Sequence, residues 1–334
     1  MPIQYKVVGR TDVGLVRSGN EDCLHIDREN NVLAVCDGMG GHRAGEVASH
    51  SASQTIRTTF THLHDELLAD PDLDLDIILP PSGELLLKAI RLANREIHNR
   101  SVADPALSGM GTTVVAVALE DDYMSIAHVG DSRAYRLEKR RIAPLTTDHS
   151  WVAEMRQKNL IGPDEAANAV GKNVITRALG VRENVEIDYR LINVNPGDVF
   201  ILCSDGLCGF ADDHEIYDVA ERANGDLKRM VDDLIQMAND RGGADNVTVV
   251  AFSIEETAPS DYDEMSVFTL DAETPESLAV EDGWLQRIEN YRREAPADST
   301  DSQAASEDSP NKLLLSIIFA AFVVIAAAIV YLSA

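Results

Sequence analysis

Residues 32–42 read VLAVCDGMGGH, a short apolar run that ends in an aspartate and is followed directly by glycine. Residues 32–36 predict a buried strand, because the run is too short for a helix and contains β-branched side chains. Asp37 therefore lies at the edge of a core. Since an unpaired buried carboxylate costs several kcal/mol, we expect Asp37 to have a partner that neutralises its charge.

The same construction, an acidic residue at the end of an apolar run, recurs in widely separated parts of the chain. It is found in the segments GNED (19–22), HVGDS (128–132), CSDG (203–206) and GGADNVT (242–248). A fold that gathered these carboxylates would make them repel one another. A hard divalent cation bound by oxygen ligands turns that repulsion into attraction, so the pattern favours a metal site.

The apolar runs mostly come in close pairs separated by short polar turns. This spacing favours antiparallel hairpins over a strict alternation of strands and helices, and it predicts an α+β fold. We expect strands over 32–36, 112–119, 123–129, 133–137, 185–193, 198–203 and 247–254, and amphipathic helices over 45–68, 84–101, 214–223 and 226–240. Residues 149–180 are polar and punctuated by glycine, which predicts a short helix and a mobile flap.

The composition changes after residue 254. The chain has a net charge of −27, and residues 255–311 are acidic, with little periodicity, which predicts a flexible linker with one short helix over 284–293. Residues 313–334 carry no charge and are long enough to span a bilayer as a helix. A buried core helix is the alternative, but we favour a transmembrane anchor over 312–334.

Several other functions are excluded by particular residues. A basic stripe for nucleic acid is absent. The glycine-rich segment 38–45 fails as a dinucleotide motif at Arg43 and as a phosphate-binding P-loop at Glu46. The acidic segment 70–80 lacks the glycine of a calcium-binding loop. The four cysteines form no CxxC pair and are predicted to be reduced and buried: Cys23, Cys36, Cys203 and Cys208.

Seven segments in order, RSGNED, VCDGMGGH, GMGTT, GDSRAY, TTDHS, CSDG and ADNVT, closely resemble those of the bacterial metal-dependent protein phosphatases of type 2C. The resemblance covers residues 5–254, so we expect a catalytic domain over 1–254. It implies a four-layer αββα sandwich of two antiparallel sheets flanked by helices. It also implies a serine/threonine phosphatase that uses Mn²⁺ or Mg²⁺, with two core ions activating a water and a possible third ion.

The resemblance assigns roles to individual residues. Asp37 is expected to bridge the two core ions, and Arg17 to bind the substrate phosphate through its planar guanidinium. The remaining expected ligands are Asp22, the Gly38 carbonyl, Asp205 and Asp245 for the core ions, and Asp131 for the third ion. One departure is Met39, which stands where eukaryotic relatives carry a histidine. His42 lies nearby in the sequence, but a surface or structural role explains it more simply.

Two other classes of function remain open at the level of sequence. The chain could be a catalytically silent module that binds phosphoproteins, or a structural metal-binding domain. The presence of every expected ligand together with Arg17 favours the enzyme. We expect phosphorylated Ser/Thr proteins as substrates, a cognate kinase as the source of their phosphate, and no nucleic-acid partner. With no secretory signal in residues 1–10, we expect an inner-membrane protein whose catalytic domain lies in the cytoplasm.

Overall fold

β3 (Val32–Met39) is buried on both of its faces, which explains its continuous apolar sequence. Val32, Ala34 and Cys36 contribute to a core shared with helices, whereas Leu33 and Val35 contribute to a core between two sheets. Side chains alternate between the faces of a strand, so a central strand in a layered fold must be apolar at every position. The computed structural model describes residues 3–41, 43–70, 79–162, 165, 174–259, 262, 264–270 and 275–294.

β3 belongs to the larger of two antiparallel sheets, which has the strand order β12-β9-β6-β5-β3-β2, with β4 pairing with the end of β3. The bounds of its other strands are β2 Asp22–Asp27, β4 Gly111–Thr112, β5 Val114–Glu120, β6 Tyr123–Val129, β9 Ile187–Asn193 and β12 Met265–Leu270. The smaller sheet has the order β1-β11-β10-β7-β8. Its strands are β1 Gln4–Asp12, β7 Arg133–Glu138, β8 Arg141–Pro144, β10 Val199–Cys203 and β11 Val247–Glu256.

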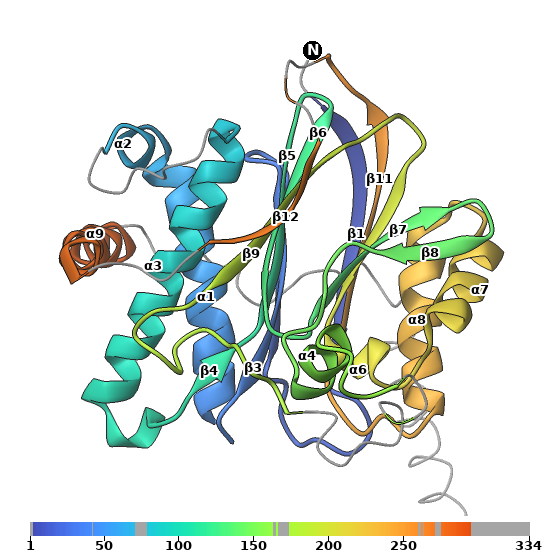
Figure 1. Ribbon diagram of the computed structural model, residues 1–334, viewed down its shortest axis with the longest axis horizontal. Helices are drawn as coiled ribbons and strands as arrows, with labels where there is room; N and C mark the ends of the chain where they lie inside the picture. The colour runs from blue at the N-terminus through green and yellow to red at the C-terminus, as the bar shows by residue number, and fades with distance from the viewer. Residues whose placement is uncertain are drawn as a thin grey trace, which may run out of the picture. The chain divides into compact units, whose positions relative to one another are not determined.

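Helices cover the outer face of each sheet, and the two sheets pack against each other (Figure 1). The larger sheet is covered by α1 (Arg43–His62) and α3 (Pro81–Ala103), and α2 (His64–Leu68) and α9 (Pro275–Glu294) pack against these two helices. The smaller sheet is covered by α7 (Asp213–Ala223) and α8 (Leu227–Asp240). Two short helices, α4 (Trp151–Gln157) and α6 (Asp205–Cys208), lie at one end of the sandwich, the lower end in Figure 1. The arrangement of two antiparallel sheets flanked by helices confirms the expected α+β fold.

Two strands of the smaller sheet were not expected from the sequence. β1 carries polar or charged residues such as Lys6 and Arg10 on its exposed positions, and β8 has only four residues. β1 is nevertheless paired along its whole length with β11, from Gln4 opposite Glu256 to Asp12 opposite Val247. An edge strand needs only one apolar face, so its apolar pattern is weaker than that of a central strand.

β12 and α9 lie beyond residue 254, in the segment 255–311 that was expected to be a flexible linker. β12 pairs antiparallel with β9, and α9 packs on α1 and α3. Trp284, Leu285 and Ile288 of α9 are buried in the same core as β3. The expected limit of the catalytic domain at residue 254 therefore leaves out two elements that complete its larger sheet and one helical layer.

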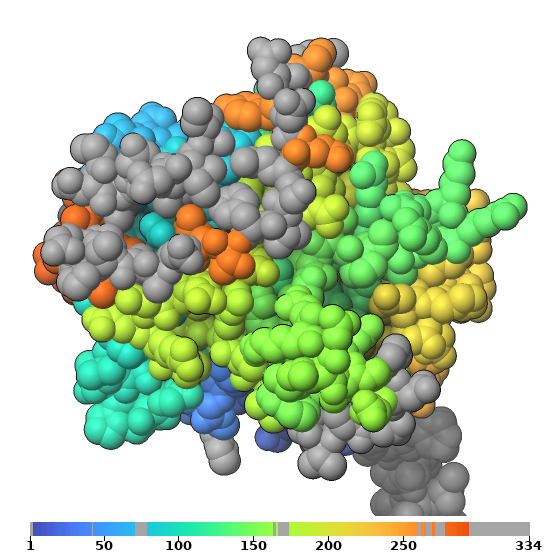
Figure 2. Space-filling view, in the orientation of Figure 1, coloured from blue at the N-terminus to red at the C-terminus, as the bar shows by residue number. Residues whose placement is uncertain are grey.

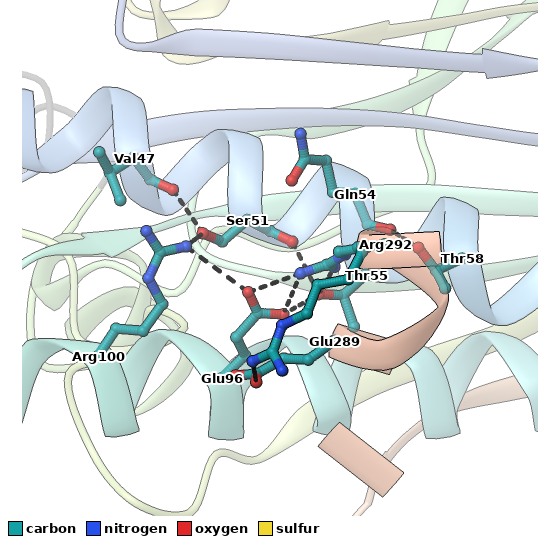
Figure 3. A network of polar contacts seen from close by, with 10 residues as sticks. Val47, Ser51, Gln54, Thr55, Thr58, Glu96, Arg100, Glu289 and Arg292 are labelled. Carbon is teal, nitrogen blue, oxygen red and sulfur yellow. Dashed lines mark hydrogen bonds and ion pairs between the residues drawn. The ribbon is translucent and has the colours of Figure 1, made fainter. Parts of the chain in front are cut away.

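Arg292 of α9 enters a polar network between α1 and α3 (Figure 3). Its Nη1 donates to Glu96 Oε1 over 2.9 Å, and its Nη2 donates to Thr55 Oγ1 over 2.9 Å. Nearer the start of α9, the Arg95 guanidinium of α3 donates two hydrogen bonds of 2.7 Å to the Asp282 carboxylate. These ion pairs hold α9 in one position along the helical layer.

No helix among the described residues is both long and apolar enough to cross a membrane. Residues 312–334, expected to be a transmembrane anchor, lie outside the described residues. The same is true of His42 and of residues 166–173 in the expected flap. The described part of the flap contains α4, which begins with Ser150 as its N-cap and agrees with the expected short helix.

Candidate metal centre

Asp22 and Asp37 lie directly opposite each other in the antiparallel pair formed by β2 and β3. Opposed residues in such a pair project from the same face with their Cβ atoms about 5 Å apart. Asp22 is 5% exposed, and its Oδ2 accepts hydrogen bonds from Ser204 Oγ (2.8 Å) and Thr248 Oγ1 (2.7 Å). Since Thr248 lies in β11 and Ser204 directly follows β10, Asp22 joins the two sheets at this end of the sandwich.

Asp205 and Asp245 reach the same place from the smaller sheet. Asp205 begins α6, directly after β10, and Asp245 stands two residues before β11. The carboxyl groups of Asp205 and Asp37 lie within hydrogen-bonding reach of each other. The ends of β3 and β10 thus bring together carboxylates that are far apart in the sequence, as the sequence pattern predicted.

The grouping of carboxyl groups has a large electrostatic cost. Burial, together with the charges of Asp22, Asp205 and Asp131, raises the pKa of Asp37 well above its ordinary range. Burial and the charges of Asp205 and Asp245 raise the pKa of Asp22 to about 6. Each group therefore resists ionisation next to the others, and a divalent cation bound between them would remove the conflict.

Asp131 lies in the turn between β6 and β7, close to Asp205. Burial and the charges of Asp205 and Asp148 raise its pKa to about 7. The carboxyl group is 7% exposed, and its Oδ1 accepts no hydrogen bond from the described residues. A buried oxygen of this kind is costly unless something else binds it, and a hard cation suits a donor set that consists of carboxylate oxygens.

Gly38 is required by packing at the point where β3 meets α1. A Cβ atom at this position would lie 2.2 Å from the Gly45 carbonyl oxygen and 2.6 Å from that of Glu21. The Gly38 N–H also donates to the Glu21 carbonyl over 3.1 Å. The close approach of these two backbone segments explains why glycine follows Asp37.

Arg17 lies beside the carboxylate cluster. Its Nη2 donates to Asp245 Oδ2 over 2.8 Å, and the charges of Glu21 and Asp37 also act on its guanidinium. About half of the side chain is exposed, at 48%. A guanidinium that is anchored on one edge and open on the other can bind a phosphate oxygen through its remaining N–H groups.

A second cluster of titratable groups, which the sequence analysis did not identify, consists of His128, His149 and Asp188. Their potential ligand atoms all lie within 4.8 Å of one another. The two imidazoles are stacked with centroids 4.6 Å apart, so their in-plane lone pairs do not converge on one point. Burial and the neighbouring His149 lower the pKa of His128 to about 4.

Hydrogen bonds account for this second cluster without a cation. His149 Nδ1 accepts from the Gly130 N–H (3.1 Å), and its Nε2 lies 3.2 Å from Asp188 Oδ2. Asp188 Oδ1 accepts from Arg177 Nη1 and from Thr269 Oγ1 of β12, both over 2.8 Å. The cluster therefore connects β12 to the turn that carries Asp131. His128 and His149 stood in segments singled out by sequence, HVGDS and TTDHS, whereas Asp188 comes from β9, a distant strand.

The chain is similar in sequence to known phosphatases. Residues 17–250 match the family model described as protein phosphatase 2C. The chain is 36% identical over 244 residues to the serine/threonine phosphatase stp of Listeria monocytogenes serotype 4b (strain F2365), which covers 72% of this chain and 92% of that relative. The family match over residues 17–250 includes the segments that carry the carboxylates.

Solved structures agree with the sequence similarity. The Mycobacterium tuberculosis serine/threonine phosphatase PstP/Ppp aligns with a TM-score of 0.65 and 33% identity, over 76% of this chain and 100% of that chain. The catalytic domain of the serine/threonine protein phosphatase PstP, in complex with 2 manganese ions, aligns with a TM-score of 0.64 and 32% identity, over 77% and 100% of the two chains. A similar fold with a similar sequence therefore holds a pair of manganese ions.

Proposed function

The chain belongs to the protein phosphatase 2C family, and we propose from this that its carboxylate cluster hydrolyses phosphoserine and phosphothreonine in proteins. Mn²⁺ or Mg²⁺ is the cofactor, as in the relative that contains two manganese ions. The observation that supports the site most strongly is the convergence of carboxyl groups from separate segments, with raised pKa values at Asp22, Asp37, Asp131 and Asp205.

The residues of the cluster fit two ions and a third, weaker one. Asp37 stands among the other carboxylates and would hold both core ions, with the Gly38 carbonyl next to it. Asp22, Asp205 and Asp245 would complete the ligands of the core ions, and Asp131, with its unpaired Oδ1, would bind the third. When bound, these ions neutralise phosphate charge and lower the pKa of a water so that it can attack phosphorus.

The protein's own side chains orient the substrate and the ligands. Arg17 would bind the phosphate oxygens through the N–H groups that do not contact Asp245. Ser204 and Thr248 hold one oxygen of Asp22, which leaves the other directed at the cluster. Asn246 accepts from the Glu21 N–H over 2.8 Å and so fixes the segment that precedes Asp22.

Phosphate release from p-nitrophenyl phosphate and from a phosphothreonine peptide tests this function. We expect turnover with Mn²⁺, none with EDTA, and a loss of at least about a hundredfold in kcat for Asp37→Asn, because the substitution removes a ligand charge shared by both ions. Asp240→Asn is the matched control, since Asp240 is exposed on α8 and contacts Gln236. Near-normal turnover by Asp37→Asn at saturating Mn²⁺ would contradict the assignment.

We also propose that residues 312–334 anchor the protein in the inner membrane, with the catalytic domain in the cytoplasm. The uncharged run 313–334 is long enough to cross a bilayer, and Lys312 flanks it. Phosphoproteins at the membrane surface, phosphorylated by a cognate Ser/Thr kinase, are then the proposed substrates. Arg287 and Arg292 add little to the orientation, because they form ion pairs with Glu66 and Glu96 of the catalytic domain.

A further inference from the structure

Exposed apolar side chains border the carboxylate cluster. Leu15 and Val16, in the turn between β1 and β2, are 69% and 70% exposed, and Phe210, after α6, is 40% exposed. The turn with Leu15 and Val16 and the segment with Phe210 are each connected to a segment that carries a candidate metal ligand. The Leu15 and Val16 N–H groups donate to the Gly243 carbonyl, two residues before Asp245, and Phe210 follows the helix that Asp205 begins. We call these three side chains the apolar rim.

The turn that carries Leu15 and Val16 is held firmly in place. Asn246 Nδ2 donates to the carbonyl oxygens of Val13 and Gly19, both over 2.9 Å, and so closes the two ends of the turn. Gly14 adopts a φ of +77°, and a Cβ atom there would lie 2.3 Å from the Asp245 carbonyl oxygen. The two apolar side chains are therefore exposed on a fixed backbone, which lowers the entropic cost of binding another surface to them.

The rim lies next to the group that is proposed to bind phosphate. Arg17 follows Val16 directly, and its guanidinium is 2.8 Å from Asp245. A peptide whose phosphate is bound by Arg17 places its next residues about 3.4 Å further along an extended backbone, within reach of the rim. α4 lies on the surface at the same end of the domain (Figure 2), and the rim side chains are open to such a chain because they are 40–70% exposed.

We propose that the apolar rim binds apolar side chains that flank the phosphorylated residue in protein substrates. This rests on the proposed phosphatase function and names a class of substrate for the same site. Two carboxylates lie beside the rim: Asp12 accepts from the Gly14 N–H, and Asp245 pairs with Arg17 directly after Val16. An anionic membrane surface or a second copy of this chain, with its net charge of −27, would be repelled there, whereas a neutral or basic peptide would not.

Three phosphothreonine peptides test the proposal: one flanked by Leu and Val, one by Ser, and one by Asp. With Mn²⁺, we expect kcat/KM to be about tenfold higher for the apolar peptide than for the Ser peptide, and lowest for the Asp peptide. The double variant Leu15→Ser/Val16→Ser should lose the preference for the apolar peptide. Val102→Ser, at an exposed apolar position on α3, is the matched control and should retain it.

All three proteins should hydrolyse p-nitrophenyl phosphate at the same rate, because this substrate has no flanking residues. If the wild type has equal kcat/KM for the apolar and Ser peptides but normal p-nitrophenyl phosphate turnover, the proposed role of the rim is refuted and the phosphatase function is not. No hydrolysis of any substrate would refute the phosphatase function, and the rim with it. If the double variant keeps its peptide preference but loses self-association in sedimentation or binding to vesicles, the rim binds a second copy or a membrane and the proposal fails.

Discussion

Asp22 and Asp37 face each other across two strands, and this geometry makes the metal-free centre unfavourable at neutral pH. Folding places them beside Asp205 and Asp131, and the pKa values of Asp22 and Asp131 rise to about 6 and about 7. A carboxyl with a raised pKa binds more protons in the folded state than in the unfolded state. Its contribution to the free energy of unfolding therefore falls as pH rises from about 4 to about 7.

Cation binding should reverse this loss. We expect the increase in melting temperature caused by saturating Mn²⁺, relative to EDTA, to be larger at pH 7.5 than at pH 5 by about 5 °C or more. Protons compete with the cation for the same oxygens at pH 5, and this competition is much weaker at pH 7.5. Calorimetry in a buffer that does not chelate manganese measures the difference.

The pKa of His128 is shifted in the opposite direction, so its effect on the pH dependence of stability must be separated from that of the carboxyl groups. Its pKa is lowered to about 4, so its contribution to stability is lost as pH falls through its unfolded pKa. This contribution is present with and without Mn²⁺ and cancels in the difference. Asp37→Asn should remove most of the pH-dependent gain. A Mn²⁺ effect that is equal at both pH values would show that these carboxylates do not bind the ion.

At the residue scale, the sequence located the carboxylates because each stands at the end of an apolar run. Asp37 near the end of β3, Asp205 after β10 and Asp245 before β11 follow this rule. The roles of His149 and Asp188 could not be predicted, because their contacts join β6, β9 and β12 across long separations in the chain. Nothing in the local sequence states which backbone N–H a histidine will bind.

At the scale of elements, the apolar runs of the central strands predicted the two sheets. The expected short helix over 284–293 agrees with the second half of α9, but it was placed in a flexible linker. The apolar side chains of α9 form one narrow stripe that includes Trp284, Leu285 and Ile288, and the rest of its surface is mostly polar or charged. Its sequence therefore has the composition of an acidic linker. Only the tertiary contacts with α1 and α3 reveal that the stripe is buried.

Arg292 and Arg293 offer a direct measure of how α9 is held. Arg292→Ala removes the ion pair and hydrogen bonds to Glu96 and Thr55, and leaves the 9% exposed Glu96 with Arg100 as a more distant cation at 3.6 Å. We expect a loss of about 1–3 kcal/mol in the free energy of unfolding. Arg293→Ala, which breaks an exposed pair with Glu289, should cost at most about 0.5 kcal/mol. Urea unfolding of both variants measures this, and equal losses would contradict the structural role of Arg292.

Truncation tests the combined contribution of β12 and α9, which we call the C-terminal extension. Residues 1–294 should fold with the stability of the full chain. Residues 1–254 lack β12 and α9, so the apolar surface of α1 and α3 that α9 covers becomes exposed. Removing Trp284, Leu285 and Ile288 from the core should lower the free energy of unfolding by about 3–5 kcal/mol after the entropy of ordering the helix is offset. The thermal midpoints of the two truncated proteins measure the difference. Equal midpoints would show that the extension adds nothing to the domain.

At the scale of the whole molecule, the folded extension changes how far the catalytic domain can be from the proposed anchor. A linker over 255–311 would allow a separation of about 200 Å at full extension, whereas residues 295–311 allow about 60 Å at most. Substrates of the anchored enzyme would then lie within one domain's width or two of the bilayer. Confinement of this kind raises the effective concentration of enzyme and substrate for each other.

The membrane anchor itself is tested by fractionation of cells that express the full chain or residues 1–294. We expect the full chain in the membrane pellet after high-speed centrifugation, because the uncharged run 313–334 is long enough to span the bilayer, and we expect 1–294 in the supernatant. Both should hydrolyse p-nitrophenyl phosphate equally, since the carboxylate cluster lies within 1–294. Protease added outside spheroplasts should leave the catalytic domain of the full chain intact. A full chain that stays in the supernatant would refute the anchor, and a catalytic domain degraded from outside would refute its cytoplasmic orientation.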